Sequence, residues 1–153
     1  MPKSIENSTP RLVISEILRK VSNAKTKAEK IKLLRDNSTA LRQLMIINFD
    51  ESVISVLPEG EVPYTPNDAP VGTDHTRLEH EYKGLYRFFQ GGDNRLSGLK
   101  REAMFVQLLE GLSGEEAELL CLIKDGQLSK KYKRITKAVV SEAFPQIEWG
   151  GRS

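Results

Sequence analysis

The stretch Ser113-Gly-Glu-Glu-Ala-Glu-Leu-Leu-Cys-Leu-Ile123 decides the expected fold. A serine followed three residues later by a glutamate is the capping-box pattern, in which the side chains satisfy backbone N–H groups at a helix start. The apolar residues that follow recur at the spacing of one helix face. This stretch therefore predicts a capped amphipathic helix with one buried side.

The same pattern recurs on both sides of this stretch, and we find no alternation of apolar and polar residues that would predict a strand. Helices are expected over residues 12–21, 26–35, 38–47, 51–57, 76–89, 99–109 and 135–143. The aromatic set within residues 76–89 is best explained by core packing; it comprises Tyr82, Tyr86, Phe88 and Phe89. We therefore expect an all-α, compact orthogonal multi-helix domain of seven or eight short helices.

Residues 58–74 contain four of the seven prolines, and they predict an extended connector, because proline lacks the amide hydrogen that a helix needs. This connector is also the best candidate for a subdomain boundary. Residues 1–10 and 148–153 are expected to be a flexible N-terminus and a flexible tail around a single helical domain over residues 11–147. No apolar run reaches the ~18 residues of a membrane span, and one cysteine allows no disulfide, so a cytoplasmic protein is expected.

The formal net charge of +2 conceals an uneven distribution. Residues 1–49 hold ten basic side chains against four acidic ones, whereas residues 50–82 hold one against eight. Six bases and one acid lie between Lys124 and Lys137. Such a chain is expected to present a basic face and an acidic face.

We predict no catalytic residues, no metal site and no cofactor. The group Asp74, His75, Glu79 and His80 lacks a further ligand at matched spacing, so a polar helix entry explains it better than a metal site. Cys121 stands among leucines and is expected to be a core thiol. Gly91-Gly92 has no phosphate-loop pattern after it and predicts a turn.

Two basic segments each lead into an expected helix start, where free backbone N–H groups and the helix dipole suit a phosphate. Lysine and arginine beside such a start can anchor a nucleic-acid backbone, although a solvated basic loop explains each segment equally well. The candidate DNA-binding residues are Arg95, Ser97, Gly98, Lys100, Arg101, Lys130, Lys131, Lys133, Arg134, Thr136 and Lys137.

The order of several short segments resembles a known family. They are Ile14-Ser-Glu-Ile-Leu18, Thr26-Lys-Ala-Glu-Lys-Ile-Lys-Leu-Leu34, Asp36-Asn-Ser-Thr-Ala-Leu-Arg42, Phe49-Asp-Glu-Ser-Val53, Leu96-Ser-Gly98, the run 108–120, Lys124-Asp125 and Phe144-Pro145. Over residues 12–147 the chain resembles the N-terminal, all-helical DNA-binding domain of ATP-dependent DNA ligases of the T-even-phage type. Through residues 57–64 and 88–92 it is similar to small stand-alone proteins of T-even-like phages, cyanophages among them.

The resemblance implies a domain that clasps duplex DNA across the minor groove at a nick, through both basic segments. Two departures matter. The family has a glycine before its last helix, where this chain reads Lys131-Tyr-Lys-Arg134. The ligase motif Lys-x-Asp-Gly is also missing, and Lys124-Asp125-Gly126 predicts a helix end instead.

The sequence therefore predicts a non-catalytic accessory protein of a phage, acting in replication, repair or recombination. It would bind double-stranded DNA, nicked or intact, largely through the backbone, with phage replication or repair proteins as further partners. The alternative is a protein-interaction module that docks on a phage or host protein through the acidic, proline-rich residues 50–74, without DNA contact.

Overall fold

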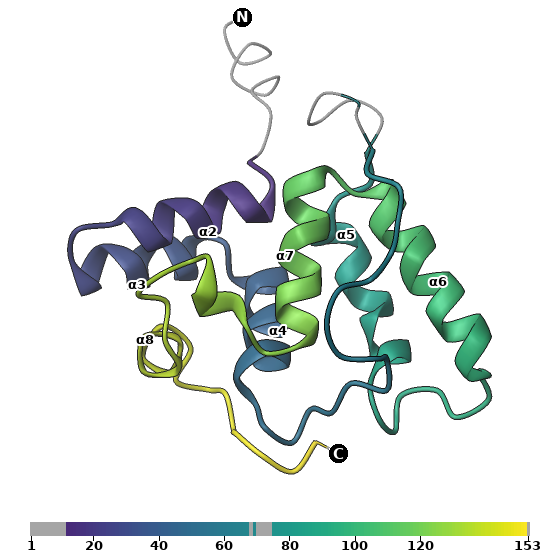
Figure 1. Cartoon of the computed structure of the whole chain (residues 1–153). Helices are drawn as coiled ribbons and strands as arrows, with labels where there is room; N and C mark the ends of the chain where they lie inside the picture. Colours follow the sequence, from purple (N-terminus) through teal and green to yellow (C-terminus); the bar gives the residue numbers. More distant parts are fainter. Residues whose placement is uncertain (1–11, 68, 70–74, 153) are drawn as a thin grey trace, which may run out of the picture.

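The computed structural model describes residues 12–67, 69 and 75–152, and within them the chain is all-helical, as expected (Figure 1). The predicted N-terminal segment 1–10 lies outside these residues. The α-helices are α2 (Ile14–Asn23), α3 (Lys27–Asp36), α4 (Ser38–Phe49), α5 (Leu78–Glu81), α6 (Gly98–Gly111), α7 (Gly114–Lys124) and α8 (Lys137–Ala143). Two 3-10 helices are η1 (Tyr82–Phe88) and η2 (Leu128–Lys130).

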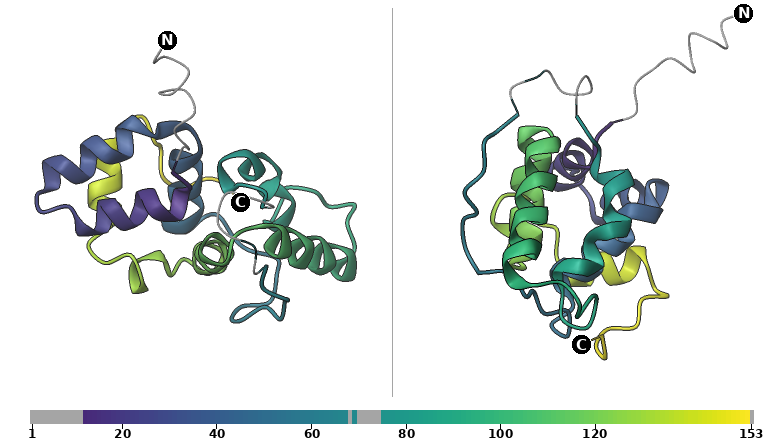
Figure 2. Two further views of the ribbon diagram at one scale, coloured as in Figure 1. Left: turned by 90° about the horizontal axis from the view of Figure 1, so that it is seen from above. Right: turned by 90° about the vertical axis from the view of Figure 1, so that its right-hand side faces the viewer.

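The helices cross at steep angles, as the orthogonal arrangement predicts. In Figure 1, α2 and α3 lie side by side across one end, α7 runs nearly at right angles to them, and α8 is seen along its axis. Figure 2 shows α6 at the end of the molecule farthest from α3 and α8. Within the described ranges, no helix combines the length and the apolar character that a membrane span requires.

Hydroxyl side chains begin four of these helices. Thr26, Ser97, Ser113 and Thr136 each accept a hydrogen bond from the backbone N–H three residues ahead, at the starts of α3, α6, α7 and α8 respectively. A cap of this kind stabilises a helix by about 1 kcal/mol, because it satisfies one of the N–H groups left free at the first turn. The predicted cap at Ser113 is therefore confirmed.

Helix α7 packs against α2, α4 and α6, which makes its apolar face the centre of the core. Four of its apolar side chains are buried, namely Ala117, Leu119, Leu120 and Ile123. They meet buried residues of the surrounding helices, including Leu18, Leu44 and Leu109, each fully inaccessible to solvent. The stretch that predicted a half-buried helix thus forms the element around which the others assemble.

The second half of the predicted capping box acts differently. Glu116 is only 1% exposed, and its carboxylate does not return to Ser113. Its two oxygens accept the backbone N–H groups of Ile14 and Leu78, both at 2.9 Å. Burial raises the pKa of Glu116, although these two hydrogen bonds act in the opposite direction. One carboxylate therefore caps the first turns of both α2 and α5.

The helix predicted over residues 51–57 does not form. Asp50 ends α4, and its Oδ1 accepts hydrogen bonds from the backbone N–H and the hydroxyl of Ser52, which turns the chain. The chain then pairs with the end of η1 and the residues that follow it. The N–H of Val56 donates to the carbonyl of Phe88, and the N–H of Gln90 donates to the carbonyl of Ile54. Local side-chain hydrogen bonding to the backbone outcompetes the helix here.

The proline-rich connector is extended where the structure describes it, as predicted, but it is packed onto α7 and does not separate two subdomains. Lys124, at the end of α7, has a side chain only 1% exposed, and its ammonium donates to the carbonyl oxygens of Pro58 and Gly60. Asp125 pairs with that ammonium and accepts the N–H of Gly60. Gly126 adopts a φ of +68°, so Lys124-Asp125-Gly126 ends a helix, as predicted.

Residues 76–89 form a shorter α-helix than expected, followed by the 3-10 helix η1. A 3-10 helix has three residues per turn, so Leu85 and Phe88 share one side, and both are buried. Tyr86, predicted to pack in the core, is 50% exposed, so that prediction is wrong for this residue. The ring of Phe88 instead packs edge-on against Phe105 of α6.

Residues 149–152, predicted to belong to a flexible tail, contact the body of the protein. Asp50, 3% exposed, accepts the N–H of Gly150 at 3.0 Å and pairs with the guanidinium of Arg152. The indole N–H of Trp149 donates to the hydroxyl of Ser141 in α8. Burial alone would raise the pKa of Asp50, but the hydrogen bonds from Ser52, Gly150 and Arg152 lower it to about 2.

We predict that Glu116→Ala lowers the free energy of unfolding by about 2–5 kcal/mol, because two buried N–H groups lose their acceptor. Glu115→Ala is the matched control, since Glu115 is exposed and pairs only with Arg19 at the surface. The control should cost less than about 1 kcal/mol. Urea unfolding at pH 7 measures both, and equal losses would contradict the capping role of Glu116.

The lowered pKa of Asp50 predicts a pH-dependent contribution to stability. The ionised carboxylate stabilises the folded chain above its ordinary pKa of 3.8, and this contribution disappears as the pH falls through about 2. Asp50→Asn should therefore cost about 2 kcal/mol at pH 7 and about half as much at pH 3. Urea unfolding of both chains at the two pH values tests this, and a difference independent of pH would refute it.

Candidate nucleic-acid interface

Residues 128–137, which we call the basic loop, connect α7 to the start of α8. Buried side chains and hydrogen bonds hold this loop in place. Leu128, Tyr132 and Ile135 are buried, with exposures of 0–2%. The hydroxyl of Ser129 donates to the carbonyl of Ile135 at 2.6 Å, which closes the loop on itself. The hydroxyl of Ser22, in α2, donates to the carbonyl of Lys133 at 2.7 Å. The loop backbone is therefore held both by the core and by α2.

The predicted cations of this loop alternate with its buried anchors and face solvent. Lys130, Lys133 and Arg134 are exposed and make no ion pair within the described ranges. Lys131 pairs with Glu118 of α7. Lys137 lies with its ammonium 4.9 Å from the centre of the Trp149 ring, a cation–π contact that leaves its charge in place. Three unneutralised cations on one fixed loop are the strongest positive feature among the predicted residues.

Arg134 holds an unusual backbone conformation, with φ at +68°, where side-chain-bearing residues are rare. Glycine adopts this conformation easily, whereas an arginine holds it at a cost of about 1–2 kcal/mol. Thr136 then caps α8 by accepting the N–H of Val139 at 3.3 Å.

The other predicted segment, residues 95–101, has fewer available charges. Ser97 caps α6 and Gly98 is its first residue, as expected, and Lys100 is exposed. Arg101 instead turns inward and donates to the carbonyl oxygens of Arg87, Asp93 and Leu96. Its guanidinium therefore holds residues 91–97 against α6, and its hydrogen-bond donors are used within the protein.

Arg95 is exposed, but it has an acidic neighbour. The hydrogen bond from its backbone N–H to Asp93 lowers the pKa of that carboxyl, so Asp93 stays ionised beside the guanidinium, with Nε and Oδ1 3.5 Å apart. The segment therefore offers Lys100 and a partly neutralised Arg95, a smaller positive charge than the basic loop.

The two predicted segments lie at opposite ends of the molecule. Figure 1 and Figure 2 both place the start of α6 at one end, the basic loop at the other, and α7 between them. Residues 51–67 cross one side of α7 and carry exposed Glu59 and Glu61. The structure therefore does not bring the eleven predicted residues together around one duplex-sized space. The basic loop is the continuous group of these residues that remains a candidate for DNA binding.

The other residues considered for chemistry are engaged structurally. His75 has its Nε2 2.6 Å from the carbonyl oxygen of Ala69, and its predicted neighbour Asp74 lies outside the described residues. No group of three or more His, Cys, Asp or Glu side chains converges on a metal-sized position in the part of the chain that the structure describes. Burial raises the pKa of the Cys121 thiol to about 11, so it stays protonated at neutral pH.

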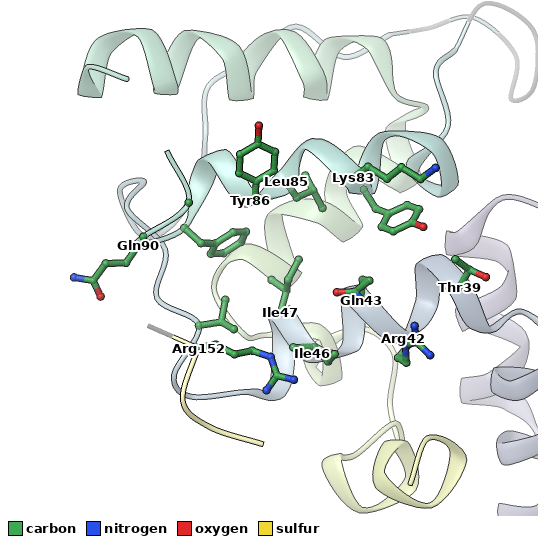
Figure 3. A pocket seen from close by; sticks show the side chains of 15 residues that line it. Thr39, Arg42, Gln43, Ile46, Ile47, Lys83, Leu85, Tyr86, Gln90 and Arg152 are labelled. Atoms are coloured by element: carbon green, nitrogen blue, oxygen red, sulfur yellow. The ribbon is translucent and has the colours of Figure 1, made fainter. Parts of the chain in front are cut away.

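A groove between α4 and η1 is a feature that the sequence did not predict (Figure 3). It encloses about 690 Å³, and Arg42 of α4 and Lys83 of η1 stand near one end of it. These two residues are 41 positions apart in the chain, so only the fold brings them together. The exposed Tyr86, assigned to the core from its spacing, is among the lining residues, but its ring points away from α4 (Figure 3).

We predict that Arg134→Gly raises the free energy of unfolding by about 1 kcal/mol, because glycine adopts a positive φ without a steric penalty. Lys133→Gly is the matched control: it removes one exposed cation at a position without a positive φ, and should lower stability. Thermal and urea unfolding measure both. A destabilised Arg134→Gly chain would show that the side chain, not the backbone, determines the residue at this position.

A sequence family matches most of the chain. The match, to a family of unknown function (DUF6433), covers residues 17–130, well over half of the 153 residues. It begins in α2 and ends within the basic loop. No curated protein and no solved structure matches the chain. By the extent of the family match, this chain belongs to the family of unknown function DUF6433.

Proposed function

We propose that this chain is a non-catalytic, cytoplasmic accessory protein of a phage that binds duplex DNA through the basic loop. The observation that carries the proposal is the exposure of Lys130, Lys133 and Arg134 on a backbone anchored by buried Leu128, Tyr132 and Ile135. A cation on a fixed backbone loses less conformational freedom when it pairs with a phosphate than one on a mobile segment. The resemblance to ligase DNA-binding domains supports the same assignment.

The arrangement favours backbone contact over base reading. Lysine and arginine neutralise phosphates and release counterions, a contribution that is the same for every sequence. The basic loop is short and is held against α2, so we expect it to contact only a few phosphates and not a long stretch of duplex. Binding should therefore be weak at physiological salt and tighter where a second partner, such as a replication or repair protein, holds the same DNA.

The separation of the two predicted segments modifies the clasp that the resemblance implies. A duplex pinched between them would have to pass through α7, so a duplex that touches both must lie along the length of the molecule (Figure 2). On the side of α7 that residues 51–67 cross, exposed Glu59 and Glu61 would repel such a duplex. We therefore assign the contact to the basic loop alone.

Fluorescence anisotropy with labelled intact and nicked 20-base-pair duplexes, over a salt series from about 50 mM, tests this proposal. Lys130→Glu with Lys133→Glu should weaken binding alike on all sequences and reduce the slope of log affinity against log salt by about 2. The matched control is Arg95→Glu with Lys100→Glu, the same charge change at the other end.

The control separates the one-ended contact from the clasp. An unchanged affinity in the control supports the basic loop alone, whereas equal losses in both variants would restore the clasp. No detectable binding by the unaltered chain at about 50 mM salt would refute duplex binding, because phosphate contacts are strongest at low salt.

The alternative, a protein-interaction module, has one specific observation in its favour. Ile54 and Val56 are 46% and 41% exposed on the segment that follows α4, close in the chain to the acidic Glu59 and Glu61. Exposed apolar side chains beside acids suit a protein partner with a basic rim. Recovery of a stoichiometric protein partner from infected cells by a tagged chain that does not bind DNA would favour this function.

A further inference from the structure

The groove between α4 and η1 has chemistry that the proposed function does not use. Its volume of about 690 Å³ lies within the range of roughly 300–1,000 Å³ that is usual for small-molecule sites. One wall comes from α4 and the other from η1 and the turn that follows it, with Ile46, Ile47 and Leu85 between them (Figure 3). The walls belong to packed elements, so the groove is preformed.

The charges along the groove have one sign. Its lining includes Arg42, Lys83 and Arg152, and none of the fifteen lining residues is an aspartate or a glutamate. Arg152 is already paired with buried Asp50. Arg42 and Lys83 make no ion pair within the described residues. Two unneutralised cations near one end of a groove attract an anion to that end.

The same end also supplies neutral hydrogen-bond donors. Thr39 and Gln43, on the same helix as Arg42, contribute a hydroxyl and an amide to the lining (Figure 3). A phosphate has several acceptor oxygens and is bound well by guanidinium, ammonium, hydroxyl and amide donors together. A single carboxylate has only two oxygens and would leave more of these donors without an acceptor.

The rest of the groove suits a flat organic ring. Beyond the cations its floor is apolar, and the lining includes the aromatic residues Tyr82 and Phe89. Both residues are partly exposed. Exposed aromatic rings beside cations are the elements with which proteins stack nucleobases without strong sequence preference. The amide of Gln90 stands at the end away from Arg42 and can meet the polar edge of a base.

We propose that this groove binds a nucleotide unit, with its phosphate at Arg42 and Lys83 and its base over the apolar and aromatic part. The unit comes either from a free mononucleotide or from single-stranded nucleic acid, since both present a phosphate and a base at the same spacing. The inference does not depend on duplex binding, because the groove and the basic loop are built from different residues.

Isothermal titration with thymidine 5′-monophosphate, thymidine and inorganic phosphate, together with anisotropy of a labelled eight-residue oligothymidylate, tests the proposal. We expect the nucleotide or the oligonucleotide to bind more tightly than either thymidine or phosphate alone. Arg42→Ala with Lys83→Ala should weaken that binding by about tenfold or more, as expected for the loss of charge-assisted hydrogen bonds.

Lys130→Ala with Lys133→Ala is the matched control, because it removes two cations from the basic loop and none from the groove. It should leave nucleotide binding unchanged while weakening duplex binding, so the two proposals can fail separately. Arg42→Lys with Lys83→Arg should retain most of the affinity, and thermal unfolding of each variant shows that the fold is intact.

The source of the ligand follows from which probe binds. Binding of the mononucleotide assigns the groove to free nucleotides, and binding of the oligonucleotide alone assigns it to single strands. Binding of neither probe, or binding that is insensitive to Arg42 and Lys83, would overturn the proposal. Displacement of the oligonucleotide by a glutamate- and phenylalanine-rich peptide at lower concentration would also overturn it and identify an acidic peptide as the ligand.

Discussion

The carboxylate of Glu116 is the constraint on which the rest of the structure depends. It sits in the first turn of α7, is 1% exposed, and accepts the first backbone N–H groups of α2 and α5. These groups belong to residues 102 positions before it and 38 positions before it in the chain. Three helix starts therefore meet at one point, and the N-terminal helices are placed relative to the second half of the chain by a charge, not only by apolar contact.

Two other buried charged groups hold non-helical segments of the chain against helices. Lys124 holds the proline-rich residues 58–60 against α7, and Asp50 holds the chain around Gly150 against the end of α4. A buried charge is costly unless hydrogen bonds satisfy it, and each of these groups has several. The pKa of Glu116 is raised, because burial outweighs its two N–H donors, whereas a guanidinium and a hydroxyl as further donors lower that of Asp50. As the pH rises, Glu116 therefore loses part of its contribution to stability, while Asp50 gains.

The sequence predicted what depends on neighbouring residues and missed what depends on distant ones. The cap at Ser113, the helix end at Gly126 and the extended connector all follow from local backbone preferences. The helix predicted over 51–57 fails because Asp50 and Ser52 form a local turn and residues 54–56 pair with a segment 34 positions away. The partners of Glu116 were equally invisible, since a capping-box pattern specifies a local partner and the fold supplied two distant ones.

The same distinction applies to the candidate sites. A basic run in a sequence does not show which cations are already used, and here Arg101 binds three carbonyl groups while Lys131 pairs with Glu118. The fold thus leaves fewer cations without an internal partner than the sequence suggested, and on the basic loop Lys130, Lys133 and Arg134 are exposed without an ion pair among the described residues. It also brings together two cations, Arg42 and Lys83, which lie far apart in the chain and yet line one groove. In a domain of near-zero net charge, the cations that lack an internal partner are the groups whose charge a phosphate could still neutralise, and both proposals rest on such cations.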